Sequence, residues 1–520
     1  MTRPPTQYPL TATNLPLAAL TVVLASWALY APPRRTQKLP LPPGPKPDPL
    51  IGHLRVLPTS DEHRVYARWG KELDSDIISI TVLGQIIVVL NSASAANEFL
   101  EQRSAISSSR AQLPMISDPD LVDWSKITGL LPYGERWRSQ RRMTHRVLHK
   151  SASMQFWPLV VKEARLALQR ISTDPDNFIR EIRRMTASTL LLAVYGYEVT
   201  SAHDPLIEVV ENALDHLCDA GVPGNFFVNT MPWLRYIPGW FPGTEWKQTV
   251  SAWRKERDEM VDIPFNWTKR QIASGTAPHS ILRSLLAELE NNPNIGHDYG
   301  EEEDRIKWVT GTLFGGNWSR YASMLIFILA MTLNQHVLFK AQAEVDEVIG
   351  QDRLPEMSDR ESLPYVECVM REVLRWHPVT PLAIPHACTE DQEYRGYRIP
   401  KGATVIGNVW AIGHDESVYP QPEKFNPDRF LDPQVPKPPT FGFGRRSCPG
   451  VHLAESTLFI TMTTLLALFN IRPIKDEKGN EILPEINMKS NALVSYPADF
   501  KCSITPRSEK AARILRQSVE

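Results

Sequence analysis

The sequence FGFGRRSCPG, Phe441 to Gly450, decides the fold together with the segment VHLAESTLFITMTTLLALF that follows it. Apolar residues recur in the second segment at helical spacing, so the pattern predicts a helix that begins just after Cys448. A helix N-terminus stabilises a thiolate, and glycines 442, 444 and 450 let the backbone approach a flat ligand closely. The residues alone therefore indicate either a metal-bound sulfur or a buried structural thiol, the common state of a lone cysteine.

Length and composition bound the class of protein. The chain has 520 residues, and its 57 Lys plus Arg against 59 Asp plus Glu argue against a nucleic-acid binder, which usually shows a basic excess. Hydrophobic residues make up 42% and charged residues 22%, so the chain can bury a large core. Five widely spaced cysteines without a C-x-x-C pair signal neither a disulfide framework nor a zinc ribbon. Because no repeat or low-complexity linker divides the sequence, one large domain is predicted.

The periodicity of apolar residues predicts a mainly α protein with small β-sheets. β-Branched residues on both sides of Gly84 and Gln85 predict a hairpin over 76–90, and short strands are expected near 394–399 and 493–504. Helices are predicted over 153–172, 178–195, 205–218, 245–272, 281–289, 304–334, 337–349 and 365–377.

The cysteine segment resembles the F-x-x-G-x-R-x-C-x-G signature of the cytochrome P-450 superfamily, the haem-thiolate monooxygenases, at Phe441, Gly444, Arg446, Cys448 and Gly450. The resemblance implies a haem b cofactor with Cys448 as its axial thiolate, which pushes electron density onto iron and favours O–O cleavage. It also implies that Arg446 donates to a haem propionate, that Phe441 packs beside the sulfur, and that both glycines belong to the cofactor-binding loop.

Three charged residues resemble a structural network of this family. Glu372 and Arg375 form an E-x-x-R pair, and a spacing of three places them on one helix face. The same spacing recurs at 135/138, 181/184 and 302/305, so the pattern alone proves little. Because the pair precedes NPDRF, with Arg429, and then the cysteine segment, the order along the chain matches the family, and the resemblance implies fold support by these three residues.

Further haem contacts are implied by resemblance. Trp137 and Arg141 resemble a W-x-x-x-R pair that approaches the propionates from a helix, and His386 occupies the position of another propionate partner. The alternative for each is a surface ion pair or a core aromatic residue. A group of arginines around the pair would attract an acidic redox partner, although such groups are often simply solvated: Arg136, Arg138, Arg142, Arg146 and Arg445.

The segment GTLFGGNWSRYASML, 311–325, departs from the family pattern A/G-G-x-D/E-T-T. In the alignment with Gly315 and Gly316, Trp318 replaces the acid and Ser319 replaces the first threonine. In the family the acid–alcohol pair delivers protons on the distal side of the haem, whereas an indole does not exchange protons readily. Ser319 either keeps this role through water ordered by Asn317 or Arg320, or the oxygen chemistry has changed; alternatively, Trp318 simply packs away from the haem.

The N-terminus predicts a membrane anchor. Residues 15–31 form an uncharged apolar stretch followed by basic residues, and 17 helical residues span about 25 Å, the short end of a bilayer core. A cleaved signal peptide is the rival, but its basic residues should precede the apolar stretch. We expect a lumenal segment 1–14, a basic and proline-rich hinge 32–47, and a catalytic domain 48–520 on the cytosolic side of the endoplasmic reticulum membrane. That location argues against use of the glycosylation sequon at Asn266.

The resemblance covers nearly the whole chain and is strongest to mushroom members of secondary metabolism. By position in the family, substrate contacts are expected from 106–123, from 315–319 and from 379–383, including Thr380 and Leu382. These segments are mostly apolar, which suits a terpenoid or polyketide. The predicted activity is insertion of one oxygen atom from O2, with electrons from an NADPH-dependent reductase. The alternatives are a haem-thiolate isomerase or peroxide-dependent rearrangement enzyme, and a haem-binding protein without turnover.

Overall fold

Helices form most of the part of the chain that the structure describes, as the sequence predicts. This computed structural model describes residues 39–520 apart from 202, 223, 292–297, 492 and 519–520. The predicted lumenal segment 1–14, the predicted anchor 15–31 and the first part of the hinge, 32–38, lie outside the described residues.

The helices are α2 (Glu62–Glu72), α3 (Ala93–Ala96), α4 (Ser104–Ser107), α5 (Pro114–Ser117), α6 (Glu135–Leu148), α7 (Lys150–Ser153), α8 (Trp157–Thr173), α9 (Phe178–Tyr195), α10 (Pro205–Gly221), α11 (Trp246–Ala273), α12 (Ile281–Glu290), α13 (Tyr299–Phe314), α14 (Asn317–Leu333), α15 (Gln335–Val348), α16 (Pro364–Trp376), α17 (Val409–Gly413), α18 (Val451–Leu468) and α19 (Glu509–Gln517). The strands are β1 (Ile77–Val82), β2 (Gln85–Leu90), β3 (His386–Ala387), β4 (Gln392–Tyr394), β5 (Tyr397–Ile399), β6 (Thr404–Gly407), β7 (Phe469–Arg472), β8 (Ile474–Lys475), β9 (Glu481–Ile482), β10 (Met488–Ser490), β11 (Ser495–Pro497) and β12 (Ser503–Pro506).

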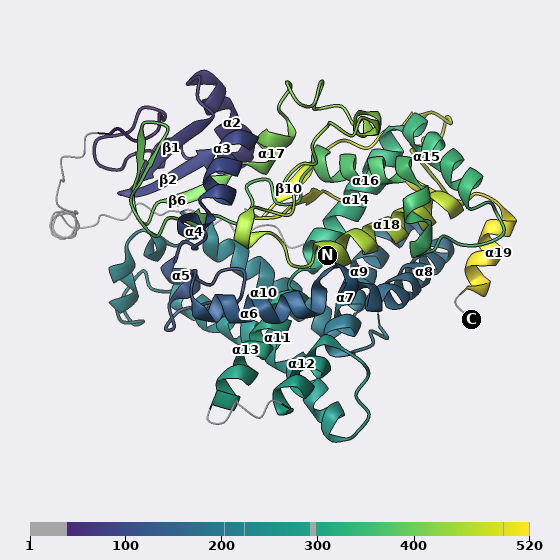
Figure 1. Cartoon of the computed structure of the whole chain (residues 1–520), viewed down its shortest axis with the longest axis horizontal. Helices are drawn as coiled ribbons and strands as arrows, with labels where there is room; N and C mark the ends of the chain where they lie inside the picture. The colour runs from purple at the N-terminus through teal and green to yellow at the C-terminus, as the bar shows by residue number, and fades with distance from the viewer. Residues whose placement is uncertain (1–38, 202, 223, 292–297, 492, 519–520) are drawn as a thin grey trace.

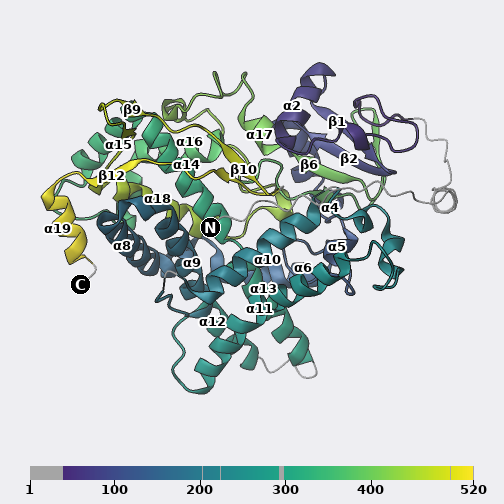
Figure 2. The same ribbon diagram turned by 180° about the vertical axis from the view of Figure 1, so that it is seen from behind.

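A four-stranded sheet in the order β1-β2-β6-β3 lies at one end of the molecule, and α19 lies at the other (Figures 1 and 2). β1 and β2 form the predicted antiparallel hairpin, whose two turn residues, Leu83 and Gly84, both have positive φ. β6 then adds to β2 in parallel, pairing Ile87 with Thr404. The first and last thirds of the chain therefore share one sheet.

The described part of the proline-rich hinge lies against this sheet. The carbonyl oxygens of Pro42 and Pro43 accept hydrogen bonds from the Ser79 hydroxyl and backbone N–H, at 2.6 and 2.8 Å. Pro40 accepts a hydrogen bond from the backbone N–H of Arg398 at 2.8 Å. Prolines leave their carbonyls free as acceptors while fixing φ, so residues 39–47 cross the sheet along a set path.

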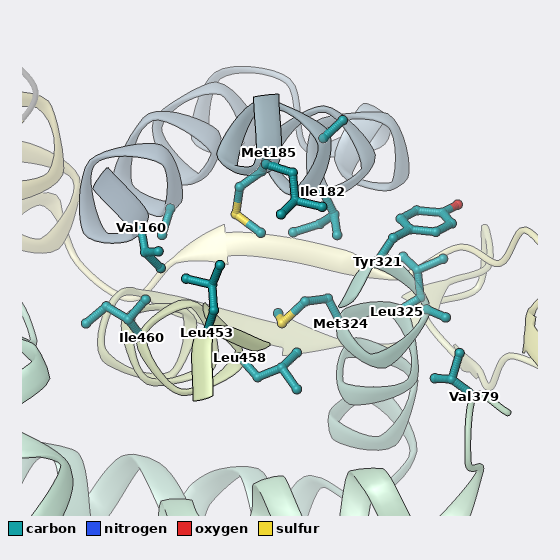
Figure 3. Close-up of a cluster of buried hydrophobic side chains, with 14 of the residues drawn as sticks. Val160, Ile182, Met185, Tyr321, Met324, Leu325, Val379, Leu453, Leu458 and Ile460 are labelled. Atoms are coloured by element: carbon teal, nitrogen blue, oxygen red, sulfur yellow. The ribbon is translucent and has the colours of Figure 1, made fainter. Parts of the chain in front are cut away.

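The main core is built where α8, α9, α14 and α18 meet (Figure 3). Met185 of α9 points toward Leu453 of α18, and Met324 of α14 lies beside them. Within the described residues α18 is long and apolar enough to cross a membrane, but 78% of it is buried, so it is a core helix. A second cluster, on the face of the sheet that carries Val88 and Val405, includes Phe443, which brings the cysteine segment against β6.

The helix predicted over 304–334 is interrupted. α13 ends at Phe314, and α14 begins at Asn317 after two glycines. At the break the N–H of Gly316 bonds to Leu313 at 3.2 Å, the tighter spacing of a 3₁₀ turn. Because two adjacent glycines weaken a helix interior, the sequence itself supplies the reason for the interruption.

Candidate functional site

A network of backbone hydrogen bonds shapes the loop that carries Cys448. The Cys448 N–H donates to the carbonyl of Phe441 at 2.7 Å, and the Arg446 N–H donates to that of Phe443 at 3.0 Å. The carboxylate of Glu101 accepts the N–H of Gly444 at 2.5 Å. Gly444 has φ of +51°, and a Cβ there would lie 2.4 Å from the Leu100 carbonyl oxygen, so glycine is required for this approach.

The Cys448 thiol lies three residues before the first residue of α18. It lies deep enough in the protein for burial to raise its pKa, yet its side chain is accessible. The N–H of Gly450, at the start of α18, donates to the sulfur, and this bond and the charges of Arg320 and Arg141 favour the thiolate. The other four cysteines are buried. Among the five, Cys448 alone combines an accessible side chain with a backbone N–H donor at the start of a helix.

α6 carries the predicted Trp137 and Arg141 toward the same region. Trp137 is buried and lies under the guanidinium of Arg446, 4.4 Å from its ring centroid. Arg446 already donates to the carbonyls of Ser108 and Leu131, at 2.7 and 2.6 Å. Arg141 makes no hydrogen bond or ion pair with any described residue, although burial lowers its pKa. Of the two arginines, Arg141 therefore has more donors free for an added carboxylate.

His386 is held from β3 in a defined tautomer. Its Nδ1 lies 2.8 Å from the carbonyl oxygen of Ser107 and must donate, because a carbonyl only accepts. Burial lowers the pKa of His386 to about 3, so the ring is neutral and its Nε2 carries no proton. A propionate beside Nε2 would need the ring to take up a second proton, which burial opposes.

Arg110 is a buried residue that the sequence reasoning did not identify. It donates to the carbonyls of Gly129, Ile384 and Pro385 and so joins the loop before α6 to the loop before β3. Arg110 is the one cation in 106–123, a segment whose other charged residues are three aspartates, and this was the available signal. Its donors go to backbone oxygens, so its role in the loops is structural.

The predicted distal residues lie at the break between α13 and α14. Gly316 and Ser319 are exposed, whereas residues 320–332 of α14 are buried. The Ser319 hydroxyl donates to the Gly316 carbonyl at 3.2 Å. Trp318 packs against Tyr321 and Tyr496, with ring centroids 6.0 and 5.4 Å apart, and its buried indole N–H has no hydrogen-bond partner among the described residues.

The other predicted pocket residues lie at different depths. Gly315 and Thr380 are half-buried, and the Thr380 carbonyl accepts the N–H of Ala383 at 3.0 Å. Leu382 is half-buried and packs against the cluster of Ile78, Ile80 and Val89 under the sheet. That packing ties Leu382 to the sheet.

Glu372, Arg375 and Arg429 come together in the interior. The Glu372 carboxylate accepts two hydrogen bonds from Arg375, at 2.7 and 2.8 Å, and one from Arg429 at 3.3 Å. Both members of the Glu372–Arg375 pair have fully buried side chains. Arg375 also donates to the carbonyls of Gly413 and Pro422. The three residues thus fasten α16 to the loops that lead to the cysteine segment.

This set of groups fits a haem. It combines an accessible thiol that can serve as an axial ligand with an arginine and an indole, Arg141 and Trp137, whose donors have no partner among the described residues. A haem carries two propionates that need such donors. The donor set therefore matches the chemistry of the cofactor.

Comparison with known proteins agrees with this geometry. The family model described as Cytochrome P450 matches residues 42–498. Cytochrome P450 monooxygenase 98 of Postia placenta is 39% identical over 492 residues, 93% of each chain. Cytochrome P450 monooxygenase claR of Ampulloclitocybe clavipes is 39% identical over 92% of this chain and 88% of its own. Cytochrome P450 monooxygenase COX2 of Coprinopsis cinerea is 37% identical over 98% and 97%.

The fold and the cysteine loop define a haem-thiolate protein, and the chain belongs to the cytochrome P450 family. The protein is accordingly a P450 monooxygenase, and its cofactor is haem bound through a cysteine thiolate.

Proposed function

We propose that this protein inserts one oxygen atom from O2 into a hydrophobic secondary metabolite of terpenoid or polyketide type. The single observation that supports the assignment of the ligand is Cys448, a deep yet accessible thiol that accepts the Gly450 N–H at the start of α18. When bound, haem supplies the activation of O2. Trp137, Arg141 and Arg446 would hold the propionates, and Phe441, Gly444 and Gly450 belong to the loop that carries Cys448. His386 would donate to a propionate only after its ring takes up a second proton.

The substrate pocket is proposed to lie over the break between α13 and α14. Gly315, Gly316 and Trp318 line it from these helices, and Thr380 and Leu382 line it from the loop after α16. The break supports this proposal because it leaves Gly316 and Ser319 accessible on a helix that is otherwise buried. Ser319 would hold a water with its hydroxyl and pass a proton inward.

An isomerase or peroxide-dependent rearrangement remains the second candidate, and one observation favours it. Trp318 stands where the family has an acid and packs between two tyrosines, so its N–H offers no exchangeable proton. A reaction that needs no protons would tolerate this change. Product mass separates the two, because isomerisation leaves the mass unchanged and monooxygenation adds one oxygen.

Two variants test the assignments. Cys448→Ala should abolish the red-shifted Soret band of the reduced, CO-bound protein, and a band retained in this variant would contradict the ligand assignment. Ser319→Ala should divert NADPH electrons into hydrogen peroxide and lower product per NADPH, whereas Ser319→Thr should preserve coupling. Unchanged coupling in Ser319→Ala would remove the serine from proton delivery and favour the second candidate.

The proposed location is the endoplasmic reticulum membrane, with a single-pass anchor at 15–31. Exposed aromatic residues support a membrane-facing surface on the catalytic domain itself: Trp240 and Tyr236 are 82% and 73% exposed, and Phe227 and Phe241 are exposed beside them. Aromatic side chains of this kind favour the membrane–water interface. Deleting 1–38 should release only part of the protein from membranes. The fraction that stays membrane-bound should fall further when Trp240→Ser is added to the deletion.

The proposed electron donor is an NADPH-dependent reductase that docks on the arginines of α6. Arg136 and Arg146 are already paired, with Asp304 and Glu288. Arg138 and Arg142 are exposed and have no ion pair with a described residue, but Arg138 lies over the Tyr133 ring, so Arg142 is the freer cation for an acidic partner. Arg142→Glu should raise the KM for the reductase and make this KM less dependent on salt concentration, while the CO-bound spectrum stays unchanged.

A further inference from the structure

Arg320 is a buried cation without a counter-charge. It stands on the first turn of α14 with 5% of its surface exposed, and its Nε and Nη1 are buried without a hydrogen-bond partner. Burial lowers its pKa to about 10, so it still carries its charge at neutral pH. Among the titratable groups of the described residues, the Cys448 thiol is the one that raises that pKa, so Arg320 lies within electrostatic range of Cys448.

Two neighbouring arginines, Arg110 and Arg446, do not share this condition, whereas Arg141 also lacks a partner among the described residues but is only half-buried. Arg110 and Arg446 are buried too, but each donates to backbone carbonyls. Arg320 forms no ion pair with any acid in the described chain. An unpaired buried charge is strongly unfavourable, and buried charges in proteins are generally paired. A partner for Arg320 that the described chain does not supply would have to come from a bound molecule.

Other unsatisfied polar atoms lie on the same turn. The side-chain oxygen of Asn317 and the indole N–H of Trp318 are buried without partners, and Ser319 between them and Arg320 is exposed. The turn therefore carries an accessible hydroxyl at Ser319 and, at the next position along the chain, a buried guanidinium with unpartnered donors. Planar guanidinium groups match carboxylates with two parallel hydrogen bonds.

We propose that Arg320 determines substrate specificity by pairing with a carboxylate on an otherwise apolar substrate. The proposal rests on the proposed function and narrows its substrate class from hydrophobic metabolites to hydrophobic carboxylic acids. A haem propionate is the competing source of a carboxylate. Arg320 stands on the α13–α14 side, whereas the residues assigned to the propionates come from α6, β3 and the cysteine loop, and Arg141 among them has free donors.

The test uses the purified full-length holoenzyme and two probes that differ only in charge. Dodecanoate and methyl dodecanoate are titrated below their micellar concentrations, at a pH where the acid is ionised, and binding is read from the substrate-induced shift of the Soret band. Haem per chain and the reduced, CO-bound spectrum are recorded for each variant. Arg320→Leu removes the charge at similar volume, and Arg320→Lys retains it.

The wild type should bind dodecanoate roughly 10- to 100-fold more tightly than its ester, the worth of a charge-assisted hydrogen bond. Arg320→Leu should lose this preference with its haem content unchanged, and Arg320→Lys should keep part of it. Equal binding of both probes by the wild type, or a preference retained in Arg320→Leu, would overturn the proposal. Loss of haem in Arg320→Leu, with both probes weakened equally, would assign Arg320 to a propionate instead. A wild type without the red-shifted CO band would instead refute the haem-thiolate assignment itself.

Discussion

Replacing Glu372 by Gln should destabilise the fold more than almost any other single change of charge. The carboxylate accepts two hydrogen bonds from Arg375, one from Arg429 and one from the Asn426 N–H at 2.7 Å. Both side chains of the Glu372–Arg375 pair are 0% exposed, so Glu372→Gln leaves a guanidinium in the interior without its counter-charge. Breaking a buried pair in this way costs about 3–5 kcal/mol.

The assay is urea-induced unfolding followed by tryptophan fluorescence, with haem retention recorded in parallel. Glu302→Gln is the matched control, because it has the same spacing to Arg305 but a carboxylate that is 22% exposed. Arg305 also keeps Glu301, so the control should lose less than about 1 kcal/mol. A loss in Glu372→Gln no larger than in the control would refute the view that this pair supports the fold.

Two further changes probe the loop and the acid stability. Gly444→Ala would put a Cβ 2.4 Å from the Leu100 carbonyl oxygen at a φ of +51°, so it should lower the free energy of unfolding by more than about 2 kcal/mol and reduce the haem content. The control Gly300→Ala, which has open space around it, should leave the stability unchanged. Comparable thermal stabilities of the two variants would contradict this. Burial lowers the pKa of His414 to about 3. Below pH ~6.5 this histidine is therefore protonated in the unfolded chain but neutral in the folded protein. The free energy of unfolding should fall by about 1.4 kcal/mol per pH unit as the pH drops toward 3. His414→Gln should flatten that slope by this amount in unfolding experiments between pH ~6 and ~4, and an unchanged slope would exclude the histidine as its source.

The fold could be predicted where apolar residues recur with a clear helical or strand period. The hairpin 76–90 and the helix 178–195 coincide with β1, β2 and α9, because each carries a clear alternation or a clear apolar face. β6 was not predicted, since a four-residue strand that ends in a glycine gives no readable period and depends on pairing with β2 and β3. The break in 304–334 was missed for the opposite reason: the apolar pattern continues across Gly315 and Gly316 although the backbone does not.

The site could be predicted in its residue types more than in its contacts. The cysteine signature led to Cys448, and its spacing placed the thiol before α18. No pattern in the sequence indicates that His386 donates to the Ser107 carbonyl, or that Arg320 is buried without a partner among the described residues. Both facts depend on which neighbours surround a side chain in three dimensions. Arg110 and Glu101 were missed because they bind backbone groups, and a backbone partner cannot be identified from residue types.

The parallel pairing of β2 with β6 has a consequence for how the chain is made. About 300 residues separate Ile87 from Thr404, and at about 5–20 residues per second roughly 15 to 60 s pass before the ribosome delivers the partner strand. Throughout that interval one edge of the nascent hairpin shows unpaired backbone and a row of Ile and Val, a template for aggregation. Slowing translation prolongs this exposure, so the yield of recombinant protein should respond to added chaperones and not to slower synthesis.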